Sequence, residues 1–218
     1  MRFVPLLAAT CLGTGAALLA GRAALNRLPQ PTPESSSASL ERIHRFAPDP
    51  ELRREAALLL AARAEGDPQR QRQLLAGQGW GRDPLAAVAL KRDALAASAL
   101  GRPNAAALRW QLLLRRFPQQ PAAADALYAL GQQQPALHAQ LLQRFPAHPA
   151  ALAAASERGR ATHLARWGVR WPGAAAALQK ACGGKAKPSE RNQLARGLAQ
   201  LGDAEAARRC LKDTPASA

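Results

Sequence analysis

One short pattern recurs along this chain and restricts it to a small set of folds. Arg-Phe-Pro-x-x-Pro occurs at 116–121 and again at 144–149. A degenerate third copy, Arg170-Trp171-Pro172, places the aromatic residues 28 and then 26 positions apart. The first Pro of each copy stops a helix, and the second is suited to the first turn of the next helix. Repetition of this kind predicts a solenoid of helical hairpins, in which each hairpin buries its apolar face against its neighbours.

The composition agrees with a helical solenoid. Ala accounts for 53 and Leu for 34 of the 218 residues, whereas aromatic residues make up only 4%. Ala and Leu are strong helix formers, and sheets favour the β-branched and aromatic residues that are scarce here. We therefore predict an all-α fold. Because the repeat is irregular and shorter than the 34 residues of a tetratricopeptide repeat (TPR), we expect an irregular TPR-like α-superhelix of stacked hairpins.

The first 39 residues have a different character. Residues 3–21 carry no charge, and 19 helical residues would extend about 28 Å, close to the thickness of a bilayer core. We expect residues 1–27 to be a signal peptide or a retained anchor helix, and we favour export with a retained anchor. Residues 28–39 are rich in Pro and Ser and predict a flexible tether. Residues 40–218 then form the superhelical domain.

Periodic apolar runs separated by Pro and Gly predict eleven helices in that domain. They cover 51–65, 69–76, 84–100, 104–117, 122–130, 136–145, 150–158, 161–168, 174–181, 190–201 and 204–211. Asp67 and Asp83 each precede a Pro and are expected to cap the N-termini of helices. Gly101, Gly131 and Gly202 each follow an apolar helix end and are expected to adopt the left-handed conformation.

The chain is strongly basic, with a formal net charge of +15 and a pI near 11.4. Of its 30 cationic side chains, 25 belong to Arg. Two interpretations remain open at this stage: a solvated basic surface that reflects compositional bias, or attraction to an anionic partner. Nucleic acid has only the charge in its favour and conflicts with an exported N-terminus, so we expect no nucleic-acid partner.

Catalytic and metal-binding patterns are not evident in the sequence. The four histidines make no pair at helical spacing with a carboxylate partner, and His138 occupies the repeat position of Trp110, which predicts a packed side chain. Acidic residues fall at helix starts or, like Asp93, on helix faces expected to be polar. Glu157 and Glu190 each precede an Arg, which favours their ionised form. We therefore predict no catalytic residue, no metal site and no cofactor.

Three stretches nevertheless resemble a known family. They are Asp83-Pro84-Leu85-Ala86-Ala87, the ALYALG run at 126–131 and, most specific, HLARWGVRWPGA at 163–174. From Trp80 to Cys210 the chain resembles the N-terminal α-superhelical region of soluble lytic murein transglycosylases, in particular the cyanobacterial branch. Those lyases cleave peptidoglycan glycan strands with one Glu of a Glu-Ser motif in a lysozyme-like domain. Here Glu34-Ser35 lies in the expected tether.

The resemblance therefore implies the superhelix of such a peptidoglycan lytic transglycosylase without its catalytic domain. Its expected role is to bind and position cell-wall murein. The alternative is a TPR-like scaffold that binds another envelope protein and never belonged to an enzyme.

Two of the three cysteines are candidates for a disulfide. Cys182 ends one predicted helix and Cys210 lies two helices further on, so a hairpin stack would make them neighbours. An oxidising compartment favours a bridge between such a pair. Two buried thiols that act as small apolar side chains are the equal alternative.

Overall fold

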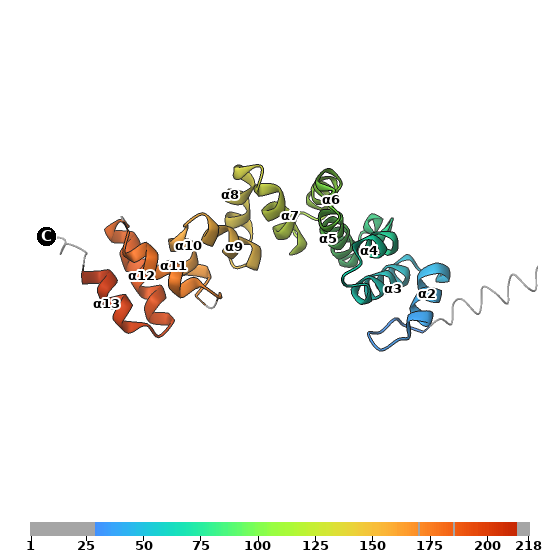
Figure 1. The fold of residues 1–218 in the computed structure, drawn as a ribbon, viewed down its shortest axis with the longest axis horizontal. Coiled ribbons are helices and arrows are strands. Elements are labelled where there is room, and N and C mark those ends of the chain that lie inside the picture. The colour runs from blue at the N-terminus through green and yellow to red at the C-terminus, as the bar shows by residue number, and fades with distance from the viewer. Residues whose placement is uncertain (1–28, 170, 185, 213–218) are drawn as a thin grey trace, which may run out of the picture. The chain divides into compact units, whose positions relative to one another are not determined.

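The computed structural model describes residues 29–169, 171–184 and 186–212, and all the regular structure of these residues is helical (Figure 1). The α-helices are α2 (Ser37–Phe46), α3 (Pro50–Arg63), α4 (Pro68–Leu75), α5 (Pro84–Ala99), α6 (Pro103–Arg116), α7 (Ala122–Gly131), α8 (Pro135–Arg144), α9 (Pro149–Glu157), α10 (Ala161–Trp167), α11 (Ala174–Cys182), α12 (Pro188–Gln200) and α13 (Ala204–Lys212). A single 3-10 turn, Gln78–Trp80, joins α4 to α5. The predicted all-α class is confirmed. None of the described helices is long and apolar enough to cross a bilayer.

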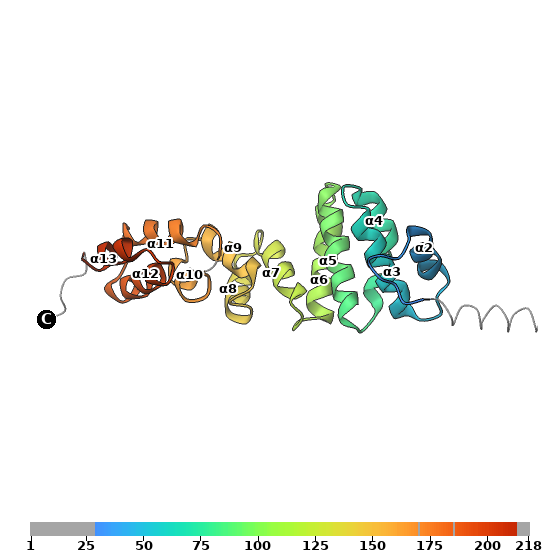
Figure 2. The same ribbon diagram turned by 90° about the horizontal axis from the view of Figure 1, so that it is seen from below.

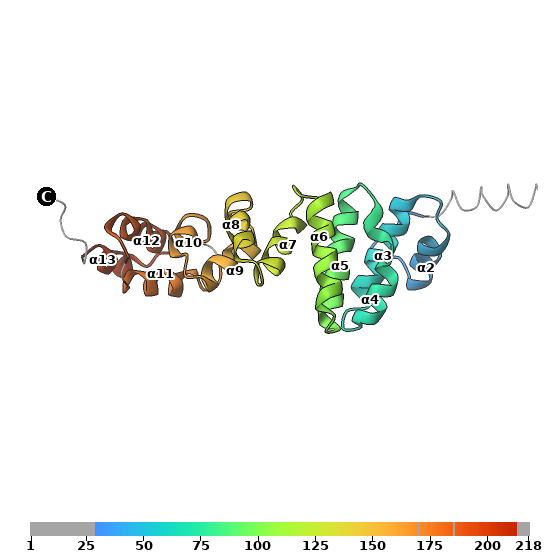
Figure 3. The same ribbon diagram turned by 90° about the horizontal axis from the view of Figure 1, so that it is seen from above.

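The chain divides into two compact units, one up to Arg109 and one from Trp110 onward. In the first unit, α2 packs on α3, α3 on α4 and α4 on α5, and α3 also contacts α5 (Figures 2 and 3). In the second unit, the helices from α7 to α13 pack in sequence, and α10 also contacts α12. Within each unit a helix therefore buries its apolar face against helices that are close to it in the chain.

The helix starts follow the sequence signals closely. The expected caps Asp67 and Asp83 are confirmed, because Asp67 accepts the Arg70 N–H at 2.9 Å and Asp83 accepts the Ala86 N–H at 3.1 Å. In each case Pro occupies the first helical position, where its missing N–H leaves no intrahelical bond unmade. Eleven predicted helices correspond to described helices, with ends that differ by a few residues.

The left-handed conformation predicted for three glycines is found at two of them. Gly101 and Gly202 have φ values of 65° and 84°, so their expected left-handed conformation is confirmed. The same expectation for Gly131 is wrong. Gly131 is the last residue of α7 and does not have a positive φ; a Cβ atom there would lie 2.4 Å from Cδ2 of His138. Gly131 is needed because the histidine ring packs directly against its backbone.

Helix α2 is the element that the sequence patterns did not predict. It begins at Ser37, inside the segment 28–39 that was expected to be a tether, and the Ser36 side chain accepts the Ser39 N–H at 3.2 Å. The Arg63 guanidinium of α3 donates to the backbone oxygens of Pro33 and Ser35 at 2.7 and 2.5 Å. These bonds hold the turn before α2 to α3. The expected anchor, residues 1–27, and Leu28 lie outside the described residues.

In the third copy of the repeat the helix ends before the Arg-Trp-Pro motif, within one residue of the predicted end at 168. Helix α10 stops at Trp167, four residues before Trp171, and the Gly168 N–H donates to Leu164 O at 2.8 Å. Trp171 follows in a turn and packs, partly buried, on the C-terminal core. Gly173, with a φ of 84°, then leads into α11. Trp167 therefore takes the helix-ending position that Phe117 and Phe145 hold in the other copies.

Two buried charges tie together the helices of the first unit. Arg54 on α3 is 4% exposed; it forms an ion pair with Asp83, and its Nε donates to Gln78 O at 2.6 Å. Asp93 on α5 is 8% exposed and accepts hydrogen bonds from Arg72 Nε at 3.0 Å and Arg109 Nε at 2.9 Å. The prediction that Asp93 lies on a polar helix face is therefore wrong. Its carboxylate joins α4, α5 and α6 from within the packed unit.

We predict that Asp93→Ala destabilises the first unit. The substitution leaves two guanidinium groups beside each other without their shared acceptor, which should lower the free energy of unfolding by about 2–3 kcal/mol. Urea unfolding followed by circular dichroism measures this change. Glu65→Ala, which removes an exposed carboxylate beyond the end of α3, is the control and should change stability by less than about 0.5 kcal/mol. Equal effects of the two substitutions would contradict the assigned role of Asp93.

Candidate functional site

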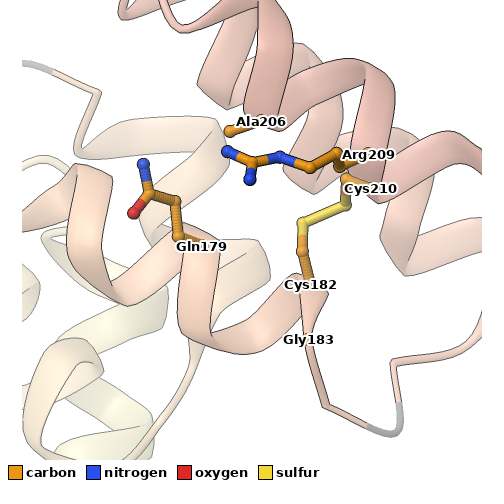
Figure 4. A pocket seen from close by; sticks show the side chains of 6 residues that line it. All are labelled: Gln179, Cys182, Gly183, Ala206, Arg209 and Cys210. Atoms are coloured by element: carbon orange, nitrogen blue, oxygen red, sulfur yellow. A yellow bond between two sulfur atoms is a disulfide. The ribbon is translucent and has the colours of Figure 1, made fainter.

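The two cysteines singled out in the sequence meet between α11 and α13. Cys182 is the last residue of α11, Cys210 lies in the last turn of α13, and the structure joins them by a disulfide with a Cα–Cα distance of 5.2 Å (Figure 4). Both side chains are buried, with 8% and 1% exposure. The bridge fastens the last described helix to α11 across a separation of 28 residues.

A cavity of about 290 Å³ opens beside this disulfide. The polar side chains at its wall are Gln179 and Arg209, and in Figure 4 the Arg209 guanidinium lies between Gln179 and the disulfide. Gln179 Nε2 already donates to Asp203 Oδ2 at 2.6 Å. The Ala206 N–H and then Gln179 hold the pKa of Asp203 below its usual value, as expected for a carboxylate that caps α13. The polar groups of this cavity thus serve mainly to hold α11 and α13 together.

A second cavity, of about 410 Å³, lies between α10 and α12. It is lined by Ala165, Arg166, Gln193, Arg196 and Gln200, and no acidic side chain is among these residues. We call it the α10–α12 groove. Gln193, Arg196 and Gln200 are spaced at i, i+3 and i+7, so they share one face of α12. The groove therefore offers two guanidinium groups and two amides from helices that are themselves packed in the core.

Close packing beneath the groove sets its width. Gly197 belongs to the buried side of α12, and a Cβ atom there would lie 3.1 Å from the Cα of Ala165 on α10. The two backbones can approach because neither residue has a large side chain. At the end of α10, the Arg166 guanidinium lies 5.4 Å from the centre of the Trp167 ring, which is itself 43% exposed. Guanidinium donors in a cavity whose lining residues include no carboxylate are suited to an anionic ligand.

A third cavity, of about 220 Å³, lies between α2 and α4 in the first unit. We call it the α2–α4 groove. It is lined by Glu41, His44, Arg45, Arg70, Gln73 and Leu74. Arg70 is paired with Glu41 at 3.3 Å, and both side chains are about half exposed. This groove is also rich in arginine, but one of its cations already has a carboxylate partner.

The buried histidine and its neighbours connect helices within the second unit. His138 is 2% exposed, as its predicted packed role requires, and its Nε2 lies 3.2 Å from Tyr128 O. The Tyr128 hydroxyl donates to Glu157, which also accepts from Gln132 Nε2 at 3.4 Å. The sequence suggested Arg158 as the partner of Glu157, but Glu157 accepts hydrogen bonds from Tyr128 on α7 and from Gln132, the residue that follows α7. This surface cluster joins α7 to α9.

The other sequence candidates are dispersed. Glu190 accepts the Lys187 N–H at 3.0 Å at the start of α12, and His148 accepts the Ala150 N–H at 3.2 Å at the start of α9. Neither residue lines a cavity described above. Among residues 29–169, 171–184 and 186–212, no three side chains of His, Cys, Asp or Glu are grouped closely enough to hold a metal ion.

The sequence patterns do not predict the grooves, because a groove depends on which helices become neighbours in the fold. One signal was present: Arg45-Phe46 is followed by Pro48 and Pro50, a variant of the recurring Arg-aromatic-Pro pattern. In the structure Arg45, Arg116, Arg144 and Arg166 each lie over the aromatic ring of the following residue, at 5.4–5.8 Å from its centre. The pattern therefore marks the ends of α2, α6, α8 and α10.

Comparison with known proteins does not indicate a family or a function for this chain. No protein-family model, no curated protein and no solved structure matches this chain. The function must therefore be inferred from the geometry of the grooves and from the sequence patterns.

Tyr128 provides a direct test of its contact with Glu157. The hydrogen bond to Glu157 raises the pKa of Tyr128, with smaller contributions from burial and from the negative charge. Because a raised pKa favours the neutral phenol in the folded protein, this contact stabilises the fold below about pH 10 and is lost as the pH rises through the raised pKa. Tyr128 is the only tyrosine, so the ultraviolet absorbance of the phenolate reports it alone.

We expect Glu157→Ala to shift that titration down toward about pH 10, the value of an unperturbed tyrosine. Glu65→Ala serves as the charge-matched control and should leave the titration unchanged. An identical titration curve for Glu157→Ala and the unsubstituted protein would show that the contact is not formed in solution.

The disulfide is expected to stabilise the last helices. Reduction should lower the free energy of unfolding of the region from α11 to α13 by about 3.5 kcal/mol, the value that the chain-entropy model gives for a loop of this length. Hydrogen exchange with and without reductant would locate the loss. The Cys182→Ala, Cys210→Ala double variant is the control, since its exchange should not respond to reductant. Alkylation of both cysteines in the denatured, unreduced protein would contradict the bridge.

Proposed function

We propose that this chain is a non-catalytic, TPR-like α-superhelix that binds the peptidoglycan of the bacterial cell wall. In this proposal it corresponds to the superhelical portion of a lytic transglycosylase, lies in the periplasm and is held at the inner membrane by residues 3–21. The sequential packing of short helices within each unit supports a TPR-like superhelix. The Trp-Gly-x-Arg-Trp-Pro-Gly-Ala stretch at 167–174 supports the relation to murein enzymes.

The α10–α12 groove is the observation that carries the binding proposal. Arg166 and Arg196 present two positive charges in one cavity, and no acidic side chain lines it. Guanidinium groups form paired hydrogen bonds with carboxylates, while Gln193 and Gln200 can pair with peptide amides. The stem peptides of murein offer both groups. The groove thus has the donors and acceptors needed for a carboxylate-bearing peptide.

The binding should be weak and sensitive to salt. All four polar side chains of the groove are exposed, and an exposed ion pair contributes roughly 0–1 kcal/mol. Salt at about 1 M shortens the screening length to roughly 3 Å, which removes most of the remaining attraction. A superhelix that positions a chain on the cell wall needs repeated, reversible contacts rather than one tight site.

We predict that the Arg166→Ala, Arg196→Ala double variant binds purified sacculi about tenfold more weakly at low salt, because two charge-assisted contacts of roughly 0.7 kcal/mol each are lost. Cosedimentation over a range of protein concentrations measures the affinity. The Arg115→Ala, Arg208→Ala variant removes the same charge from exposed positions of the same unit that do not line this groove. It should bind nearly as well as the unsubstituted protein.

Two results would contradict this proposal. Equal losses in both double variants would mean that sacculi respond only to net charge. Binding that does not change between low and high salt would remove the electrostatic basis altogether.

A scaffold for another envelope protein is the second candidate. Val88 and Leu95 lie seven residues apart on α5 and are 38% and 51% exposed, so one face of this helix presents apolar side chains to solvent. Under this alternative, sacculus binding would not depend on Arg166 or Arg196, whereas aspartate at positions 88 and 95 would abolish binding to the protein partner.

A further inference from the structure

The two grooves defined above share one construction, although they belong to different units. Each begins at a helix that ends in an Arg-aromatic pair: Arg45-Phe46 on α2 and Arg166-Trp167 on α10. The guanidinium carbon lies 5.8 Å from the ring centre in the first pair and 5.4 Å in the second. Stacking on an exposed ring restricts the arginine and lowers the entropy lost when it binds a ligand.

The opposite wall of each groove comes from the helix two positions further along the chain. Helix α4 contributes Arg70 and Gln73, and α12 contributes Gln193 and Arg196. In both helices the Arg and the Gln are three residues apart, so they project from the same face. Each groove therefore combines an arginine from a helix end with an arginine and a glutamine from a second helix.

The grooves differ in one charged residue. Glu41 lies in the α2–α4 groove and pairs with Arg70 at 3.3 Å, whereas the residues that line the α10–α12 groove include no carboxylate. The Glu41 and Arg70 side chains are 50% and 47% exposed, so this pair is screened and contributes little stability. Glu41 already occupies the place that a ligand carboxylate would take, and an incoming carboxylate would have to displace it.

We propose that the two grooves are carboxylate clamps of one chemistry, Arg45 with Arg70 and Arg166 with Arg196, and that each binds a carboxylate of an acidic peptide. The first clamp is the weaker because Glu41 competes with the ligand. This inference rests on the proposed function for the second clamp and extends it to a second site of the same chemistry.

Two probes test the clamps. The tripeptide Ala-Glu-Ala is a short acidic ligand, and poly-L-glutamate is an acidic polymer. Isothermal titration with poly-L-glutamate measures the combined affinity, and backbone NMR shifts of α2, α4, α10 and α12 report the tripeptide at each clamp. The variants are Arg45→Ala with Arg70→Ala and Arg166→Ala with Arg196→Ala, and Arg115→Ala with Arg208→Ala is the control that removes the same two charges.

We expect each clamp variant to lose the Ala-Glu-Ala shifts at its own groove and to weaken poly-L-glutamate binding severalfold more than the control does, because two charge-assisted contacts are lost. Glu41→Gln should strengthen tripeptide binding at the first clamp severalfold and leave the second unchanged. Since all the substituted side chains are exposed, circular dichroism should show unaltered helix content.

Several outcomes would overturn the inference. If Arg45→Ala with Arg70→Ala leaves poly-L-glutamate binding unchanged, the α2–α4 groove is not a clamp. The same conclusion follows if Glu41→Gln leaves the tripeptide shifts at α2 and α4 unchanged. If duplex DNA binds through these arginines and poly-L-glutamate does not bind, the ligand carries phosphate groups rather than carboxylates. If both clamps bind poly-L-glutamate and sacculi do not bind, the clamps stand and the proposed murein function fails.

Discussion

Short helices that cannot bury their apolar faces alone are the constraint on which this structure depends. The described helices are 7–16 residues long, too short to be stable in isolation. Within each unit, helices are stabilised by packing against helices close to them in the chain. Small side chains make this contact close, as at Gly197 and Ala165, where α12 and α10 approach within van der Waals distance. The grooves are a product of the same packing, because their walls are the outer edges of helices whose inner faces are buried.

Arginine has two separate roles in this basic chain. Arg54 is buried and neutralised by Asp83, and Arg72 and Arg109 share the carboxylate of Asp93. These side chains join helices within the first unit. Arg166 and Arg196 face a groove whose lining residues include no acid. A net charge of +15 does not distinguish the two roles. What distinguishes them is whether a neighbouring helix brings a carboxylate to the guanidinium group.

The predictions that succeeded rest on local chemistry. Asp before Pro marked helix starts at Asp67 and Asp83, and Gly101 and Gly202 marked helix ends, because each signal acts within one turn of backbone. Helix α2 was not predicted because its Ser-rich start resembles a linker. Its two buried side chains, Leu40 and Ile43, stabilise the helix only when α2 packs on α3. Gly131 was misinterpreted for the same reason, since its neighbour His138 belongs to the next helix.

The sequence by itself determined the all-α class, the positions of eleven helices and the recurrence of an Arg-aromatic pair at helix ends. These properties follow from residue propensities, from capping and from the spacing of Pro, all of which act over a few residues. The tertiary structure decided that Asp93 is buried between two arginines and that Arg45 and Arg166 each stand at the edge of a groove. It did so because a groove and a buried ion pair need side chains from helices that meet only when the chain packs.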